Sequence, residues 1–207
     1  MCPYGYLYDL FLGGLLRRVR LWIAHRIASG NWYPVLDLCC GTGDQLRRIS
    51  RSPQPAVGLD RDFPLLHYAR TQNRRIPLIC ADAGSLPFRN SAFRCVIISF
   101  ALHEKDPDFR FRMLQEAKRV TMPEGWLIIL DYEIPWNLSS RTARIFIGII
   151  ELLAGKHHFR FFRNFLNRGG LNGCLLRNNI PETESRLLKW GNSRIVLSHM
   201  KNQRPSC

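Results

Sequence analysis

The chain has 207 residues, 46% of them hydrophobic and 11% aromatic, which excludes a disordered chain and suffices for one α/β domain with a substantial core. Thirty basic residues against sixteen acidic ones give a formal net charge of +14, which favours anionic partners such as nucleic acid, a phospholipid surface or an acidic substrate. No uncharged apolar run approaches the roughly 20 residues of a membrane span, and no Cys/His spacing is typical of zinc. We therefore expect no metal, no secretory signal, reduced cysteines and a cytoplasmic protein.

Helical and extended segments alternate along the first two thirds of the chain. A helix is predicted over 4–28, where apolar residues recur at helical spacing. After it we expect strands over 34–39, 56–60, 77–81, 94–100 and 126–131, and helices over 44–50, 63–72 and 106–120. The last helix has the clearest start, because Asp106 is a good cap and Pro107 suits the first helical position.

The pattern changes after Pro135. An apolar helix is predicted over 139–153, followed by the basic aromatic segment KHHFRFFRNFLNR and by two strands joined by Gly191-Asn192 in a type II′ turn. We divide the chain accordingly into an N-terminal helical cap (1–30), a cofactor-binding core (31–135), a helical, basic insertion on the acceptor side (136–180) and a C-terminal β-hairpin that completes the sheet (181–207).

This alternation predicts an α/β fold with a doubly wound, mostly parallel sheet of seven strands, the last two forming an antiparallel hairpin. In such sheets ligands bind beyond the carboxyl ends of the strands. The chemistry is therefore expected near 39–44, 60, 82, 99–104 and 131–133.

The stretch VLDLCCGTGDQ ends the first predicted strand in a glycine loop. A phosphate-binding P-loop needs a Lys after its last glycine, but Gly43 is followed by Asp44. A dinucleotide loop needs a third glycine, where this chain has Leu46. Asp37 and Asp44 flank the loop and would repel a pyrophosphate. S-adenosylmethionine fits better, because its sulfonium, ammonium and ribose diol suit carboxylates and the glycines let the backbone approach.

Four stretches together resemble the class I S-adenosylmethionine-dependent methyltransferases. VLDLCCGTGD is similar to motif I of that family, and AVGLDRD follows at the expected distance. ICADAGSLPFRNSAFRCVIISFALHE resembles the next two motifs, and MLQEAKRVTMPEGWLIILDYEIP resembles the helix and fifth strand. The resemblance covers about 33–135 and is strongest to the ubiquinone/menaquinone biosynthesis C-methyltransferases.

The chain departs from that group in three places. Leu102-His103-Glu104 stands where the group usually has Leu-Arg-Asn, and Met122-Pro123-Glu124-Gly125 replaces Lys-Pro-Gly-Gly. The C-terminal third matches poorly. The methyl donor is therefore better supported than the methyl acceptor.

The resemblance implies S-adenosyl-L-methionine as cofactor, with Asp60 accepting from the ribose diol and Asp82 and Ala83 at the adenine. Asp37 is expected to hold the methionine ammonium. The other candidate cofactor-binding residues are Cys39, Gly41, Thr42, Gly43, Arg61 and Ser99. Asp37 could instead cap a turn at the end of its strand, Asp82 could start the AGSLPF turn, and Asp44 could simply favour the dipole of the following helix.

His103 and Glu104 follow the fourth strand, where the acceptor should approach. Either is a candidate general base on a phenol or enol, and the alternative is a pair that only caps or packs at the helix entry. No other covalent chemistry is needed, because the sulfonium already activates the methyl group and the protein has mainly to align the reactants.

The acceptor is expected to be a hydrophobic small molecule or lipid, such as a prenylated quinone precursor. Segments 10–36 and 141–177 are basic and apolar together, which suits an anionic membrane interface at the inner face of the membrane. One alternative is an RNA or DNA methyltransferase, although SFAL stands where [DN]PP[YFW] would be typical, so a nucleic-acid partner is not expected. The other is an inactive methyltransferase-like accessory protein, against which the retained acids argue.

Overall fold

The structure is a computed structural model that describes residues 3–49, 55–134, 148, 152, 155–188 and 192–201, with residues 3–13 and 15 described by their backbone alone. Most of the apolar helix expected over 139–153 lies outside the described residues. The expected turn at Gly191-Asn192 also lies partly outside them.

A single seven-stranded sheet runs through the molecule in the order β3-β2-β1-β4-β5-β7-β6. Its strands are β1 (Val35–Leu38), β2 (Ala56–Asp60), β3 (Leu78–Cys80), β4 (Phe93–Ser99), β5 (Thr121–Tyr132), β6 (Glu184–Leu187) and β7 (Ser193–His199). Neighbours from β3 to β5 are parallel, and β7 is antiparallel to both β5 and β6. The predicted fold class is thereby confirmed.

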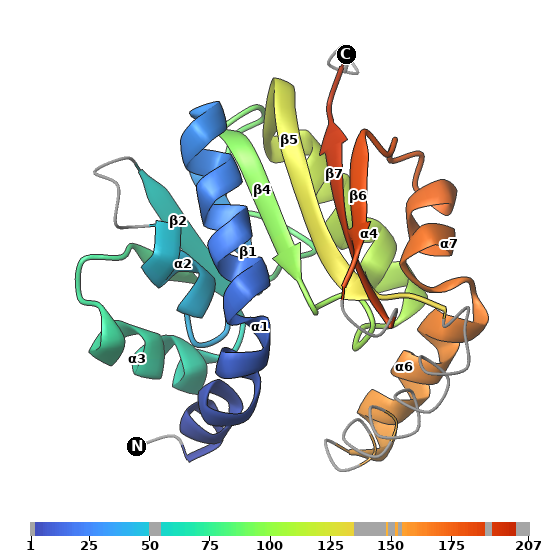
Figure 1. Cartoon of the computed structure of the whole chain (residues 1–207), viewed down its shortest axis with the longest axis horizontal. Coiled ribbons are helices and arrows are strands. Elements are labelled where there is room, and N and C mark those ends of the chain that lie inside the picture. The colour runs from blue at the N-terminus through green and yellow to red at the C-terminus, as the bar shows by residue number, and fades with distance from the viewer. Residues whose placement is uncertain are drawn as a thin grey trace.

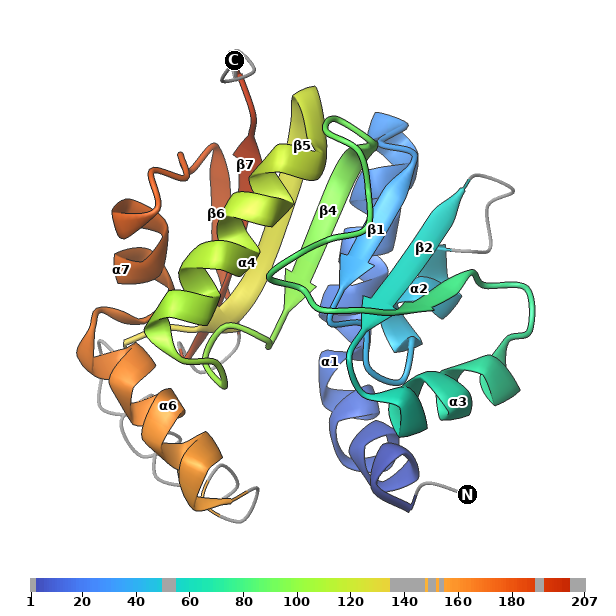
Figure 2. The ribbon, with the colours of Figure 1, turned by 180° about the vertical axis from the view of Figure 1, so that it is seen from behind.

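The helices cover both faces of this sheet. They are α1 (Pro3–Gly30), α2 (Asp44–Ile49), α3 (Phe63–Gln72), α4 (Pro107–Val120), α6 (Lys156–Asn167) and α7 (Gly170–Arg177). Figure 1 shows α1 in front of the sheet, and Figure 2 shows α4 on the opposite face. Helix α4 starts as predicted, because the Asp106 side chain accepts a hydrogen bond from the Phe109 amide at 2.9 Å.

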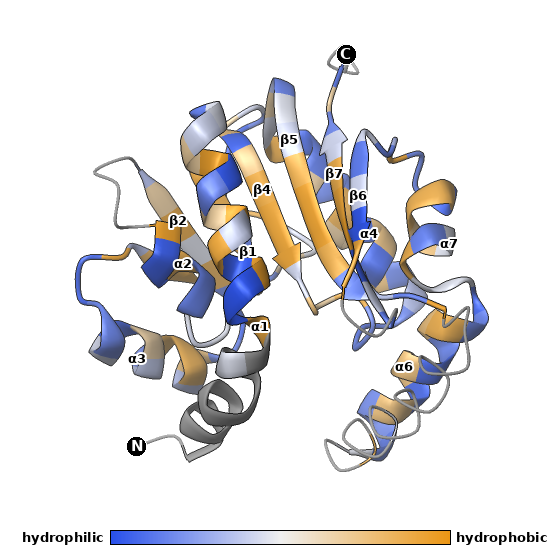
Figure 3. Ribbon diagram, in the orientation of Figure 1, coloured by the Kyte–Doolittle hydropathy of each residue, from blue (hydrophilic) through white to orange (hydrophobic). Residues whose placement is uncertain are grey.

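The two faces of the sheet bury separate hydrophobic clusters. In β4, Cys95 and Ile97 pack with Ile23 and Ile27 of α1, whereas Val96 and Ile98 pack against α4, α6 and α7. This alternation follows from the two-residue period of a strand. The central strands are apolar along most of their length (Figure 3), as expected for parallel strands covered by helices on each side.

The carboxyl ends of the parallel strands share one edge of the sheet. Beyond that edge extend α6 on one side and the N-terminal end of α1 on the other (Figures 1 and 2). Any binding site at the carboxyl edge is therefore bordered by α6 and by the N-terminal end of α1.

Among the described residues, none of the helices combines the length and the apolar character needed to cross a membrane.

Candidate functional site

The chain leaves β1 through a glycine loop with left-handed backbone. Cys39, Gly41 and Gly43 have φ angles of 59°, 52° and 70°. A Cβ added at Gly43 would come within 3.2 Å of the Ala69 Cβ on α3, whereas one at Gly41 would meet nothing within 4 Å. Gly43 therefore permits close packing, and Gly41 presents backbone to open space where a ligand can approach.

Asp60 ends β2 and holds this loop in place. Its Oδ2 accepts a hydrogen bond from the Gly41 amide at 2.7 Å, and its Oδ1 accepts one from the Asp62 amide at 2.9 Å. An ionised carboxylate has about four acceptor positions, so two backbone bonds leave capacity for a pair of hydroxyl donors. This is the chemistry that a ribose diol requires.

Asp37 lies in the middle of β1 with only 2% of its surface exposed. Burial raises the pKa of its carboxyl group from 3.8 to about 7; the nearby Arg20 opposes this shift, and Asp60 and Asp44 add to it. Ionising such a group is costly until a cation is placed near it. Asp37 is therefore suited to a positively charged ligand.

The raised pKa of Asp37 makes cation binding depend on pH. Because the protonated carboxyl must lose its proton to pair with an ammonium or sulfonium, the Kd for S-adenosylmethionine should rise by up to about tenfold per unit as the pH falls below about 7. Titration calorimetry from about pH 6 to about pH 8 measures this slope. The variant Asp37→Asn should bind more weakly at the upper end and show a flat profile, and an equally steep profile in that variant would contradict the assignment.

Asp44 is occupied by three arginines. It accepts hydrogen bonds from Arg20 of α1, from Arg47 at 2.8 Å and from Arg48 at 3.0 Å. Burial alone would raise the pKa of Asp44, but the three guanidinium groups, Arg20 foremost, lower it below its ordinary value. Asp44 therefore ties α1 to α2, a role that the sequence analysis did not predict. Arg20 itself is buried and does not belong to an exposed basic face of α1.

The remaining cofactor candidates lie at the same edge with different surroundings. Asp82 is exposed and accepts from the Gly84 amide at 2.7 Å, while the adjacent Ala83 is buried. Arg61 is exposed, and Thr42 is buried with its carbonyl oxygen accepting from Arg47 at 3.0 Å. Ser99 closes β4, and its Oγ is buried with no hydrogen-bond partner among the described residues.

His103 is buried on the loop after β4 and faces a carboxylate on β5. Its Nδ1 lies 2.8 Å from Oδ1 of Asp131, which is fully buried. The sequence indicated chemistry near 131–133 but did not pair Asp131 with His103. The sequence signal that could have indicated this pair is an acid, Asp131, in an otherwise apolar strand, together with a histidine, His103, just after the neighbouring strand.

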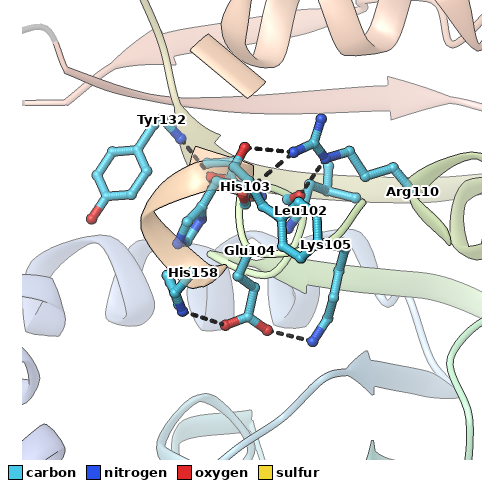
Figure 4. Close-up of polar contacts among 9 residues, drawn as sticks. Leu102, His103, Glu104, Lys105, Arg110, Tyr132 and His158 are labelled. Carbon is cyan, nitrogen blue, oxygen red and sulfur yellow. Dashed lines mark hydrogen bonds and ion pairs between the residues drawn. The ribbon is translucent and has the colours of Figure 1, made fainter. Parts of the chain in front are cut away.

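Glu104 points away from His103 and forms ion pairs. Its carboxylate lies 2.6 Å from Lys105 Nζ and 3.9 Å from His158 Nδ1 on α6 (Figure 4). Burial would lower the pKa of Lys105, but Glu104 outweighs it and the net shift is upward. The pKa of the Cys39 thiol in the glycine loop is raised mainly by burial. The charges of Lys105 and Glu104 also influence this pKa, so these two side chains lie near the loop.

Aromatic rings surround His103. The ring centroid of Tyr132 lies 4.7 Å away, and those of His158, Phe162 and Phe100 lie 5.5, 6.2 and 6.4 Å away. These rings come from the loop after β4, from β5 and from α6. The sequence predicted α6 only as an unspecified part of the helical, basic insertion over 136–180. His103 is thus packed among aromatic rings as well as against Asp131.

The residues at this edge fit S-adenosylmethionine. A buried carboxylate with a raised pKa suits its cationic groups, the spare acceptor positions of Asp60 suit its diol, and Ser99 offers a buried hydroxyl without a described partner. Within the described part of the chain, no group of three or more His, Cys, Asp or Glu is arranged to hold a metal ion.

Comparison with known proteins points the same way. Residues 35–125 match the family described as "Methyltransferase domain". The chain is 32% identical over 141 residues to a ubiquinone/menaquinone biosynthesis C-methyltransferase of Blochmanniella floridana, covering 64% of this chain and 55% of that protein. It is 34% identical over 157 residues to a demethylmenaquinone methyltransferase of Lactobacillus johnsonii, covering 71% and 58%. The chain thus spans little more than half the length of these relatives.

Solved structures share the fold. A Pyrococcus horikoshii protein superposes with a TM-score of 0.65 at 19% identity, covering 89% of this chain and 91% of that one. A structure described as a SAM-dependent methyltransferase, from Methanosarcina mazei, gives 0.59 at 18% identity, covering 81% and 92%. The predicted resemblance to methyltransferases is confirmed by the family and relative matches, and the solved structures confirm the predicted fold.

Proposed function

Residues 35–125 match a methyltransferase domain, and on that premise we propose that this chain uses S-adenosylmethionine to methylate a hydrophobic small molecule of the prenylated quinone-precursor class. The observation that carries the proposal is the buried His103–Asp131 pair, set among aromatic rings at the edge of the sheet that also holds the glycine loop. The names of the relatives support the quinone class of acceptor.

The residues of the first two strands would hold the cofactor. Asp37 would face the methionine ammonium and Asp60 the ribose diol, with Asp82 and Ala83 at the adenine. The backbone of 39–43 would form the floor, and Ser99 would supply one further polar contact. When bound, S-adenosylmethionine provides a methyl group activated by its sulfonium.

His103 would act as the general base. A phenol or enol acceptor becomes a stronger nucleophile as its proton passes to the imidazole. The activated acceptor would then receive the methyl group, and the neutral thioether would be the leaving group. If the acceptor atom is carbon, the proton that it must lose also needs a base. His103 is the candidate in both cases.

Glu104 is a weaker candidate for the base. Its carboxylate already contacts the Lys105 ammonium at 2.6 Å, so it is less available to contact an acceptor hydroxyl. Through His158 it also approaches α6. We therefore assign Glu104 to holding α6 near the loop after β4.

A methyl-transfer assay tests the proposed function. The protein would be incubated with S-adenosylmethionine labelled in its methyl group in three parallel reactions. The acceptor would be demethylmenaquinol with a short prenyl tail in detergent micelles in the first, a lipid extract in the second and an RNA pool in the third. Label in the quinol or the lipid fraction is expected. Label in RNA alone, or in none of the three while the cofactor binds, would overturn the proposal.

An anionic membrane is the proposed location of the acceptor, with α6 as the contact. Lys156, Arg160, Arg163 and Arg168 are exposed on or beside this helix, and two of them lie over aromatic rings: Arg160 is 5.2 Å from the Phe161 centroid and Arg163 is 5.9 Å from that of Phe159. Basic residues near such a surface contribute about 1 kcal/mol each.

Charge reversal of this face should abolish vesicle binding. We expect Arg160→Glu with Arg163→Glu to reduce co-sedimentation with phosphatidylglycerol vesicles at least about thirtyfold. The control is Arg74→Glu with Arg75→Glu, which changes the net charge equally at two exposed residues after α3. Equal losses in the two double variants would mean that net charge rather than α6 determines binding.

A further inference from the structure

The backbone of Leu102 and His103 is held from two sides by charged side chains. Oδ2 of Asp131 accepts from the Leu102 amide at 2.9 Å and from the His103 amide at 3.3 Å. The carbonyl oxygens of the same two residues accept from Arg110 of α4: Leu102 from Nε at 2.7 Å, and His103 from Nη2 at 3.4 Å. Figure 4 shows these contacts converging on one short piece of chain.

The other oxygen of Asp131 determines the state of the imidazole. Oδ1 accepts from the Tyr132 amide at 2.7 Å and lies 2.8 Å from Nδ1 of His103. An ionised carboxylate can only accept, so the neutral ring must carry its proton on Nδ1. The basic lone pair then belongs to Nε2.

Arg110 extends the same network to the helix at the acceptor side. Its Nη2 donates to the Phe161 carbonyl at 2.8 Å, and its Nη1 donates to Oδ1 of Asn164 at 3.1 Å, both on α6. Arg110 is buried, and burial lowers its pKa. Burying a guanidinium and a carboxylate is costly unless their hydrogen bonds are satisfied, and here Leu102 and His103 supply partners to both groups.

We infer that Asp131 and Arg110 are positioning residues, which hold His103 in the Nδ1-protonated form and fix its Nε2 as the proton acceptor. Asp131 sets the tautomer and holds the amides, and Arg110 holds the carbonyls and links them to α6. The role of His103 as a base rests on the proposed function. The position of the ring proton does not, because the tautomer can be observed without an acceptor.

Nitrogen-15 NMR of the histidine rings tests the tautomer in the wild-type protein. The chain has six histidines, and the signal that disappears in His103→Gln identifies His103. We expect a protonated Nδ1 in the wild type and a proton moved to Nε2 in Asp131→Asn, whose amide can donate to the ring. A wild-type ring protonated on Nε2 overturns the inference, and this measurement requires no variant of Asp131 to fold.

Kinetics test the consequence for the reaction, with demethylmenaquinol as the acceptor. Asp131→Asn is expected to lower kcat about 100-fold and Arg110→Lys about tenfold, with little change in KM. The exposed Arg112 on the same helix supplies the control Arg112→Lys, which should retain wild-type kcat. Wild-type kcat in a folded Asp131→Asn protein overturns the inference. A wild-type protein with the expected tautomer that methylates no acceptor contradicts the proposed function alone.

Discussion

Replacing His103 with glutamine should lower kcat about 100- to 1,000-fold and leave the Kd for S-adenosylmethionine within about twofold of the wild-type value. Glutamine can still donate a hydrogen bond to Asp131, so the loop should keep its place, but its amide cannot take up a proton near neutral pH. Single-turnover methylation of demethylmenaquinol and calorimetry with the cofactor separate the two effects.

The exposed His67 on α3 provides the matched control for this substitution. His67→Gln makes the same chemical change away from the site and should leave both quantities unaltered. If His103→Gln keeps more than about half of the wild-type kcat, His103 is not the base. Methylation of an amine that is neutral when bound, which needs no base, would then become the better explanation.

Replacing Asp60 with alanine should raise the Kd for S-adenosylmethionine about 100-fold or more. Hydrogen bonds to a charged acceptor contribute about 1.5–3 kcal/mol each, and two ribose hydroxyls would lose theirs. The same change removes the 2.7 Å bond that holds the Gly41 amide, so the glycine loop also loses its anchor. Calorimetry gives the Kd, and thermal unfolding without ligand shows how much of the effect is structural.

Asp62 is the control for charge at this edge. It is two residues away and exposed, and it caps α3 by accepting from the Leu65 amide at 2.9 Å. Asp62→Ala should therefore lower the melting temperature slightly and change the Kd less than about threefold. A Kd for Asp60→Ala that matches that of Asp62→Ala would remove Asp60 from the cofactor site.

The elements with strong local signals were predictable from the sequence. The bounds of β2 and α3 agree with the prediction residue for residue, because an apolar run ends at Asp60 and the helix begins just after its capping acid at Asp62. The start of β5 was predicted five residues late. Thr121 already pairs with Phe93 before the register shifts, and no periodic pattern in the sequence marks such an irregular pairing.

The part of the candidate site whose residues lie close together in the sequence was predictable. The part formed by residues far apart in the sequence was much less so. The glycine loop, Asp37 and Asp60 stand in one short region with a recognisable pattern. The contacts between Asp131 and His103, and between Arg110 and α6, join residues 28 to 54 positions apart. Such partners are chosen by packing in three dimensions, which a single sequence does not encode in any local periodicity.

The contact between Arg20 and Asp44 bears on how the domain could be isolated. The family match begins at residue 35, so a fragment cut at that boundary would lack the guanidinium that is also the main opposing influence on Asp37. Such a fragment would leave Asp44 with Arg47 and Arg48 as its arginine partners, and it would lose the apolar cover of α1 over one face of the sheet. Helix α1 is thus part of the binding domain, and we expect the smallest fragment that folds alone to begin before residue 35.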